Sequence, residues 1–140
     1  MSDVITGGCL CGKIRYTVSQ PVQNVIACHC TNCQKASGTG ASHNAAVPTS
    51  AVRFDSGQPK VFADVAQSGN TLYRYFCGDC GSPIYSQRAK VPETMVLKVG
   101  TLDDTNSMKL IMNIWTSSAR PWVHIDPATE SHPENRPTKS

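Results

Sequence analysis

Three cysteines lie within six residues in the spacing C-x-C-x-x-C: Cys28, Cys30 and Cys33. A cysteine often packs in a core as a small hydrophobe, but packing alone does not require this spacing. If the segment is extended, Cys28 and Cys30 share one face, and His29 points away, either toward solvent or into a supporting position behind the metal ligands. Three thiolates on one zinc ion leave a tetrahedral metal one ligand short. A vacant position is typical of catalytic rather than structural zinc.

The residues after Cys30 predict a short helix. Thr31 and Gln34 match the S/T-x-x-E/Q pattern of a helix start, and Gly38 is a suitable stop. Cys33 then lies near the positive end of the helix. That position lowers the pKa of a thiol and favours the thiolate, the form that binds metal.

Seven cysteines form an N-terminal pair, a triplet and a C-terminal pair: Cys9 and Cys11; Cys28, Cys30 and Cys33; Cys77 and Cys80. Spacing leaves two partitions open. One joins Cys30 and Cys33 to the C-terminal pair as a zinc ribbon, and leaves three thiols over. The other joins the two pairs as a closed four-sulfur site and leaves the triplet as an open site. We favour the second partition because it leaves no stray thiol.

Composition limits the classes of function. The chain has 140 residues, is 39% hydrophobic and 16% charged, and carries a net charge of +3 without a basic stripe. One soluble domain is expected, with no nucleic-acid partner. No apolar run could span a bilayer and the N-terminus lacks signal-peptide features, so we expect a cytoplasmic protein without a membrane partner. Thiols stay reduced in that compartment, and an odd number of closely spaced cysteines favours metal over disulfides.

Alternation of apolar and polar residues between turn signals predicts a mainly β fold. Strands are expected at 13–18, 22–27, 41–47, 52–54, 60–62, 71–76, 83–86, 95–99 and 110–115. We expect the last of these to be buried on both faces, and a weak helix at 103–109. Trp115 and Trp122 are expected to pack in the core. Residues 1–126 form the predicted zinc-binding domain, and 127–140 an extended or disordered tail.

Three motifs resemble the glutathione-dependent formaldehyde-activating enzyme family, which includes the domain of centromere protein V. They are GCLCGKIRY at 8–16, CHCTNCQKASG at 28–38 and FCGDCGS at 76–82, followed by Ile114-Trp115 and Pro121-Trp122. The resemblance implies a β-tent, in which short antiparallel sheets are organised around zinc. It also implies a structural zinc on Cys9, Cys11, Cys77 and Cys80, and a catalytic zinc on Cys28, Cys30 and Cys33, two ions per chain.

The resemblance further implies carbon–sulfur lyase-like chemistry of the S-hydroxymethylglutathione synthase type. A small thiol such as glutathione takes the vacant position, ionises and attacks a small electrophile such as formaldehyde. Three anionic sulfurs make zinc a poor Lewis acid for water but suit it to a soft thiolate. The alternative is a non-catalytic binding module in which both zinc ions only stabilise structure, because fold and motif do not specify a substrate.

Overall fold

The computed structural model describes residues 4–66 and 68–135, and these form a mainly β protein, which confirms the predicted fold class. The strands are β1 (Ile5–Gly8), β2 (Arg15–Val18), β3 (Asn24–Cys28), β4 (Ser42–Pro48), β5 (Val52–Ser56), β6 (Lys60–Val65), β7 (Thr71–Phe76), β8 (Pro83–Arg88), β9 (Thr94–Lys98), β10 (Lys109–Ile114) and β11 (Glu130–Ser131). Helical segments are α1 (Thr31–Ser37) and the short 3-10 turns η1 (Thr49–Ala51), η2 (Val99–Thr101) and η3 (Thr116–Ser118). None of the helices in the described ranges is long and apolar enough to cross a membrane.

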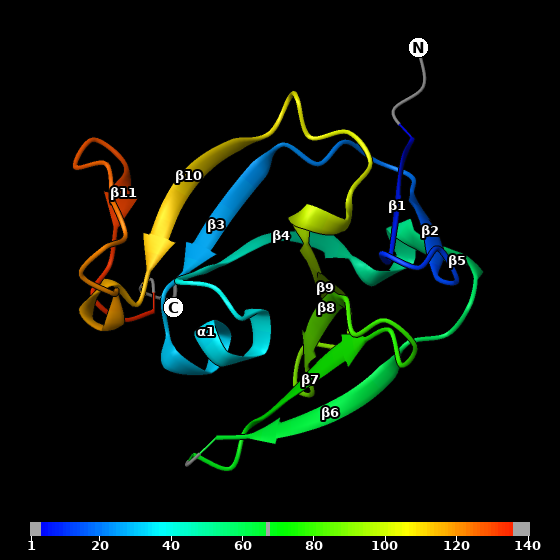
Figure 1. The fold of residues 1–140 in the computed structure, drawn as a ribbon, viewed down its shortest axis with the longest axis horizontal. Coiled ribbons are helices and arrows are strands. Elements are labelled where there is room, and N and C mark those ends of the chain that lie inside the picture. The colour runs from blue at the N-terminus through cyan, green and yellow to red at the C-terminus, as the bar shows by residue number, and fades with distance from the viewer. Residues whose placement is uncertain (1–3, 67, 136–140) are drawn as a thin grey trace.

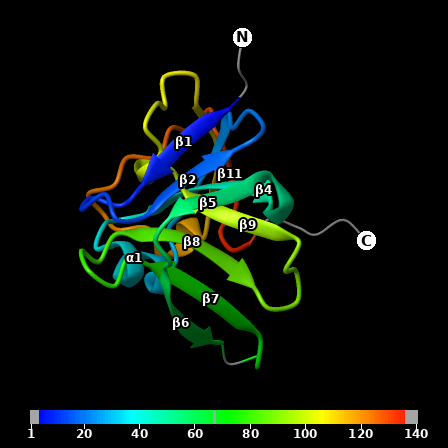
Figure 2. The ribbon, with the colours of Figure 1, turned by 90° about the vertical axis from the view of Figure 1, so that its right-hand side faces the viewer.

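The strands form two sheets. A three-stranded sheet has the order β1-β2-β5, and an eight-stranded sheet has the order β11-β10-β3-β4-β9-β8-β7-β6. The large sheet bends around α1 in Figure 1, with β3 and β10 on one side of the helix and β6 and β7 on the other. Figure 2 shows β4, β9, β8, β7 and β6 following one another toward the β6 edge.

Two strand pairs are parallel: β3 with β10, and β10 with β11. The other pairs within these sheets are antiparallel, as the resemblance implies. Strands joined by a tight hairpin must be antiparallel, whereas β3 and β10 are separated by most of the chain and are free of that constraint.

The core lies where the small sheet packs against the middle of the large one. Tyr16 and Val18 of β2 and Leu97 of β9 are fully buried there. Successive side chains of a strand point to opposite faces, and these three point inward. The first strand, β1, was not predicted because its glycines are poor strand formers. Gly7 is required by packing, since a methyl group there would lie 2.5 Å from Tyr16 Oη.

Each of the nine predicted strands overlaps an observed strand, but three other predictions are wrong. No helix forms at 103–109. Instead Asp103 turns back to bind Arg15, and β10 begins at Lys109. The strand at 110–115 is not buried on both faces, because Leu110 and Ile111 are exposed. Trp122 is 75% exposed and does not belong to the core.

The segment predicted to be an extended or disordered tail includes β11, which pairs in parallel with β10 through Glu130 and Ser131. The backbone of Trp115 also bonds to this segment, donating to the Glu134 carbonyl at 2.9 Å. Residues 136–140 lie outside the described residues. The proposed boundary between 126 and 127 stays a prediction.

Candidate metal centres and adjoining cavities

The N-terminal and C-terminal cysteine pairs lie together, and their four sulfur atoms are all within 4.8 Å of one another. Cys11 Sγ lies 3.5 Å from Cys9 Sγ and 3.8 Å from Cys77 Sγ. Two sulfurs that bind one tetrahedral zinc at ~2.3 Å lie about 3.8 Å apart, so the spacing of this four-sulfur cluster fits zinc.

Two tight turns present these sulfurs. In the first, Gly12 N donates to Cys9 O at 3.2 Å, and in the second, Gly81 N donates to Cys77 O at 2.8 Å. Gly12 and Gly81 have φ values of 83° and 82°, which residues with a Cβ rarely adopt. The glycine after each cysteine pair is therefore a requirement of the turn.

Ser82 joins the two turns. Its Oγ accepts a hydrogen bond from Leu10 N at 3.0 Å and lies 3.3 Å from Cys80 Sγ. The Ser82 hydroxyl and backbone amide hold the pKa of the Cys80 thiol at about 5. The second turn thus favours a thiolate, which is the form that binds metal.

The triplet also converges: its three sulfurs, from Cys28, Cys30 and Cys33, lie within 4.8 Å of one another. Cys28 ends β3 and Cys30 is the N-cap of α1, where its Sγ accepts a hydrogen bond from Cys33 N at 3.2 Å. The sequence pattern placed Thr31 in the capping position, and this is wrong by one residue because the preceding sulfur caps the helix. The predicted stop at Gly38 is confirmed, with φ of 71°.

The structure therefore gathers the seven cysteines in the two groups of the favoured partition. That these groups bind zinc, one as a structural and one as a catalytic ion, stays a prediction. The three thiols of the triplet differ in the direction of their pKa shifts. Hydrogen bonds with Cys28 and Cys30 hold the pKa of Cys33 far below its usual value, and hydrogen bonds with Cys30 and Cys33 raise the pKa of Cys28.

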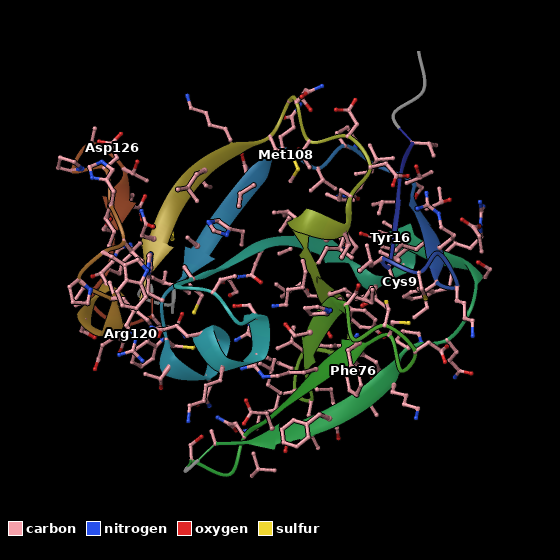
Figure 3. All side chains as sticks on the ribbon, in the orientation of Figure 1. Cys9, Tyr16, Phe76, Met108, Arg120 and Asp126 are labelled. Carbon is pink, nitrogen blue, oxygen red and sulfur yellow. The ribbon has the colours of Figure 1, made fainter. Side chains whose placement is uncertain are left out.

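Buried polar side chains hold the triplet in place. His29 is 2% exposed, and its Nε2 lies 2.9 Å from Asn113 Oδ1, so the solvent-facing alternative for His29 is wrong. Gln34 Nε2 donates to His29 O at 2.7 Å and Ser118 O at 3.0 Å, and Gln34 Oε1 accepts from Arg120 Nε at 2.6 Å. Arg120 lies on the side of the molecule opposite Cys9 in Figure 3.

Two cavities adjoin the triplet. The smaller, of about 360 Å³, lies between α1 and strands β6 to β8, and the larger, of about 1060 Å³, lies toward β10 and β11. Three residues line both: Cys33, Arg74 and Lys98. Cys28 lines the larger cavity. Cys33 therefore lies at the junction of the two cavities.

The two cations at this junction differ in their partners. Arg74 Nε binds Asp64 Oδ2 at 2.9 Å, so its charge is paired. Lys98 Nζ donates to Asn44 Oδ1 at 2.6 Å, which is a neutral partner. Burial lowers the pKa of Lys98, and the negative charge at Cys33 opposes that shift. Lys98 thus lines both cavities together with Cys33, and the side chain to which it donates a hydrogen bond is neutral.

Sequence reasoning did not identify Arg74 or Lys98. The available signal was Lys98 itself, a charged residue within the apolar strand at 95–99, since buried lysines are rare without a partner. His43, which also lines the smaller cavity, has its pKa lowered by burial and by the proximity of His29.

Comparison with known proteins supports the family resemblance and the fold. The family described as "Glutathione-dependent formaldehyde-activating enzyme" matches residues 4–118. The crystal structure of a Rhodobacter sphaeroides protein is similar, with a TM-score of 0.57 and 23% sequence identity over 72% of this chain and 90% of that chain. At this identity the likeness supports the fold alone. No curated protein sequence matches significantly. The family match confirms the predicted resemblance, and the chain belongs to the glutathione-dependent formaldehyde-activating enzyme family.

Proposed function

We propose that this chain is a zinc-dependent, carbon–sulfur lyase-like enzyme that joins a small thiol such as glutathione to a small aldehyde such as formaldehyde, or releases it. The observation that carries the proposal is the triplet beside the two cavities. Its three sulfurs converge, and no histidine, aspartate or glutamate of the described residues joins them as a fourth ligand. Cys33 opens on both cavities.

The proposed metal roles follow from the sulfur clusters. Cys9, Cys11, Cys77 and Cys80 would hold a structural zinc, and Cys28, Cys30 and Cys33 a catalytic one. Thiolate ligands suit zinc among the common divalent ions. When bound to the triplet, zinc would supply a Lewis acid that favours the thiolate form of a substrate thiol.

Lys98 is suited to balance charge during the reaction. Three thiolates and a divalent ion carry a net charge of about −1, and the Lys98 ammonium lies on the same junction. One of its three N–H groups is used by Asn44, which leaves donors for an oxygen on which negative charge develops. The larger cavity adds Arg88 and Glu130, which complement the carboxylate and amine of a zwitterionic thiol.

The chemistry needs no oxidant or reductant. The thiol sulfur forms a bond to the aldehyde carbon, and the π electrons of the C=O bond move to oxygen. The proton lost by the thiol ends on that oxygen, which gives an S-hydroxymethyl adduct in the case of formaldehyde. The reverse reaction breaks the C–S bond and returns thiol and aldehyde.

Exchange NMR tests the proposal. Glutathione and ¹³C-formaldehyde equilibrate without protein, and the zinc-loaded chain is expected to accelerate exchange between free formaldehyde and the adduct. Cys30→Ala is expected to remove the acceleration. The matched control is Thr31→Ala, which changes the neighbouring exposed residue and is expected to accelerate exchange as the wild type does. Acceleration that survives in Cys30→Ala, or no acceleration with any small thiol, would favour the non-catalytic binding module.

A further inference from the structure

The smaller cavity is too large and too apolar for formaldehyde alone. Five of its lining residues are apolar: Ala36, Ala41, Phe62, Phe76 and Pro83. Its volume is about 360 Å³. Formaldehyde has two heavy atoms and is close in size to a water molecule, which occupies ~30 Å³ in the liquid. With formaldehyde bound, most of the cavity would contain no ligand atoms in contact with its apolar lining residues.

We propose that the electrophile is an aldehyde with an apolar substituent, such as an aromatic ring, seated in the smaller cavity with its carbonyl group at Cys33 and Lys98. The inference rests on the proposed function and specifies its substrate class. A substituent of roughly six to eight carbon atoms suits an apolar cavity of this size. Phe62 and Phe76, which come from neighbouring strands, offer ring surfaces to it.

Each cavity would bind one of the two substrates. Since Cys33, Arg74 and Lys98 are the residues common to both, the sulfur and the carbonyl carbon must meet beside them. The larger cavity carries the further charged groups Arg88 and Glu130, so the polar thiol binds there. Placing its carboxylates among the apolar walls of the smaller cavity would cost their hydration.

The reaction is the same balanced addition. The thiol sulfur bonds to the carbonyl carbon, the π electrons move to the oxygen beside Lys98, and the thiol's proton ends on that oxygen. The apolar substituent takes no part in the electron flow. It contributes binding that formaldehyde lacks, because Phe62, at 61% exposure, gains apolar cover when the cavity is filled.

Benzamide is the probe that separates binding from catalysis, because its carboxamide resembles the aldehyde group but does not accept the thiol. Ligand-observed NMR on the zinc-loaded protein is expected to detect benzamide binding and no formamide binding at the same concentration. Ala36→Leu places a larger side chain in the cavity from an exposed position of α1. It is expected to weaken benzamide binding by about tenfold or more, the range for loss of one buried ring.

Two control variants make this result specific. Lys35→Leu adds an apolar side chain to the same helix at an exposed position that lines neither cavity, and is expected to bind benzamide as wild type does. On β6, Phe62→Ala removes an aromatic ring that lines the smaller cavity. Val61→Ala changes the neighbouring exposed residue, which lines neither cavity. Phe62→Ala is expected to weaken benzamide binding and Val61→Ala to leave it unchanged.

The outcomes distinguish this inference from the proposed function. Equal binding of benzamide and formamide, or unchanged benzamide binding in Ala36→Leu and Phe62→Ala, overturns the inference. If glutathione exchange is accelerated with formaldehyde but not with benzaldehyde, the inference is overturned and the proposed function stands. If benzamide binds as expected but neither aldehyde reacts with any thiol, the proposed function fails and the aldehyde assignment fails with it.

Discussion

Replacing Gln34 with alanine tests how the triplet is held. Gln34 is 7% exposed and joins α1 to the segment after β10. Its amide nitrogen donates to the carbonyls of His29 and Ser118, and its oxygen accepts from Arg120. The Gln34→Ala variant loses all three bonds and leaves the two carbonyls without these donors.

The expected loss of stability is about 3 kcal/mol. Each of the two bonds donated by Gln34 contributes about 1–1.5 kcal/mol net. The bond from Arg120 contributes no more than about 1 kcal/mol, because the exposed guanidinium can return to water. Alanine recovers a few tenths of a kcal/mol through its higher helix propensity.

Urea unfolding of the zinc-loaded protein provides the measurement. Lys35→Ala is the matched control, since Lys35 is the next residue of the same helix and is exposed. Its effect on the unfolding free energy is expected to stay within about 0.5 kcal/mol. The reasoning is refuted if Gln34→Ala costs no more than this control.

Three further predictions concern zinc and the core. Cys77→Ala is expected to leave the protein unfolded or insoluble, because structural zinc contributes directly to folding. Cys30→Ala is expected to stay folded and to lose the thiol–aldehyde exchange activity. Identical melting of the two variants would contradict separate structural and catalytic zinc sites. Tyr16→Phe removes the bond between Tyr16 Oη and Thr101 Oγ1 (2.6 Å) and is expected to cost about 1 kcal/mol in thermal unfolding; no loss would contradict that contact. Zinc uptake by the triplet is expected to release protons near neutral pH, because thiols bind zinc as thiolates and the pKa values of Cys28 and Cys30 are raised. Zinc affinity should therefore rise with pH, and calorimetry in buffers of different ionisation enthalpy measures the proton release; uptake without proton release would contradict the raised pKa values.

Local chemistry made much of the fold predictable. Alternating residues such as those of β2 predicted the strands, and glycine is the residue preferred where the backbone φ is positive. The helix stop at Gly38 followed from the same preference. At 103–109 the prediction was wrong because distant partners decide the conformation, and Asp103 binds Arg15 of β2.

The surroundings of the triplet depended on sheet order and were not predictable. Arg74 lies on β7 and Lys98 on β9, and they reach the same junction because β8 pairs with both of their strands. No periodicity in a single chain specifies that order. Trp122 shows the same limit, since its aromatic character suggested the core but no element covers it among the described residues.

Zinc-edge X-ray absorption, before and after glutathione is added, tests the central claim most directly. With two zinc ions per chain, the seven cysteine sulfurs and one lighter ligand are expected to share the eight positions, and glutathione should replace the lighter ligand with an eighth sulfur. A spectrum that glutathione leaves unchanged, or a protein that takes up a single zinc ion, would contradict an open zinc site on Cys28, Cys30 and Cys33.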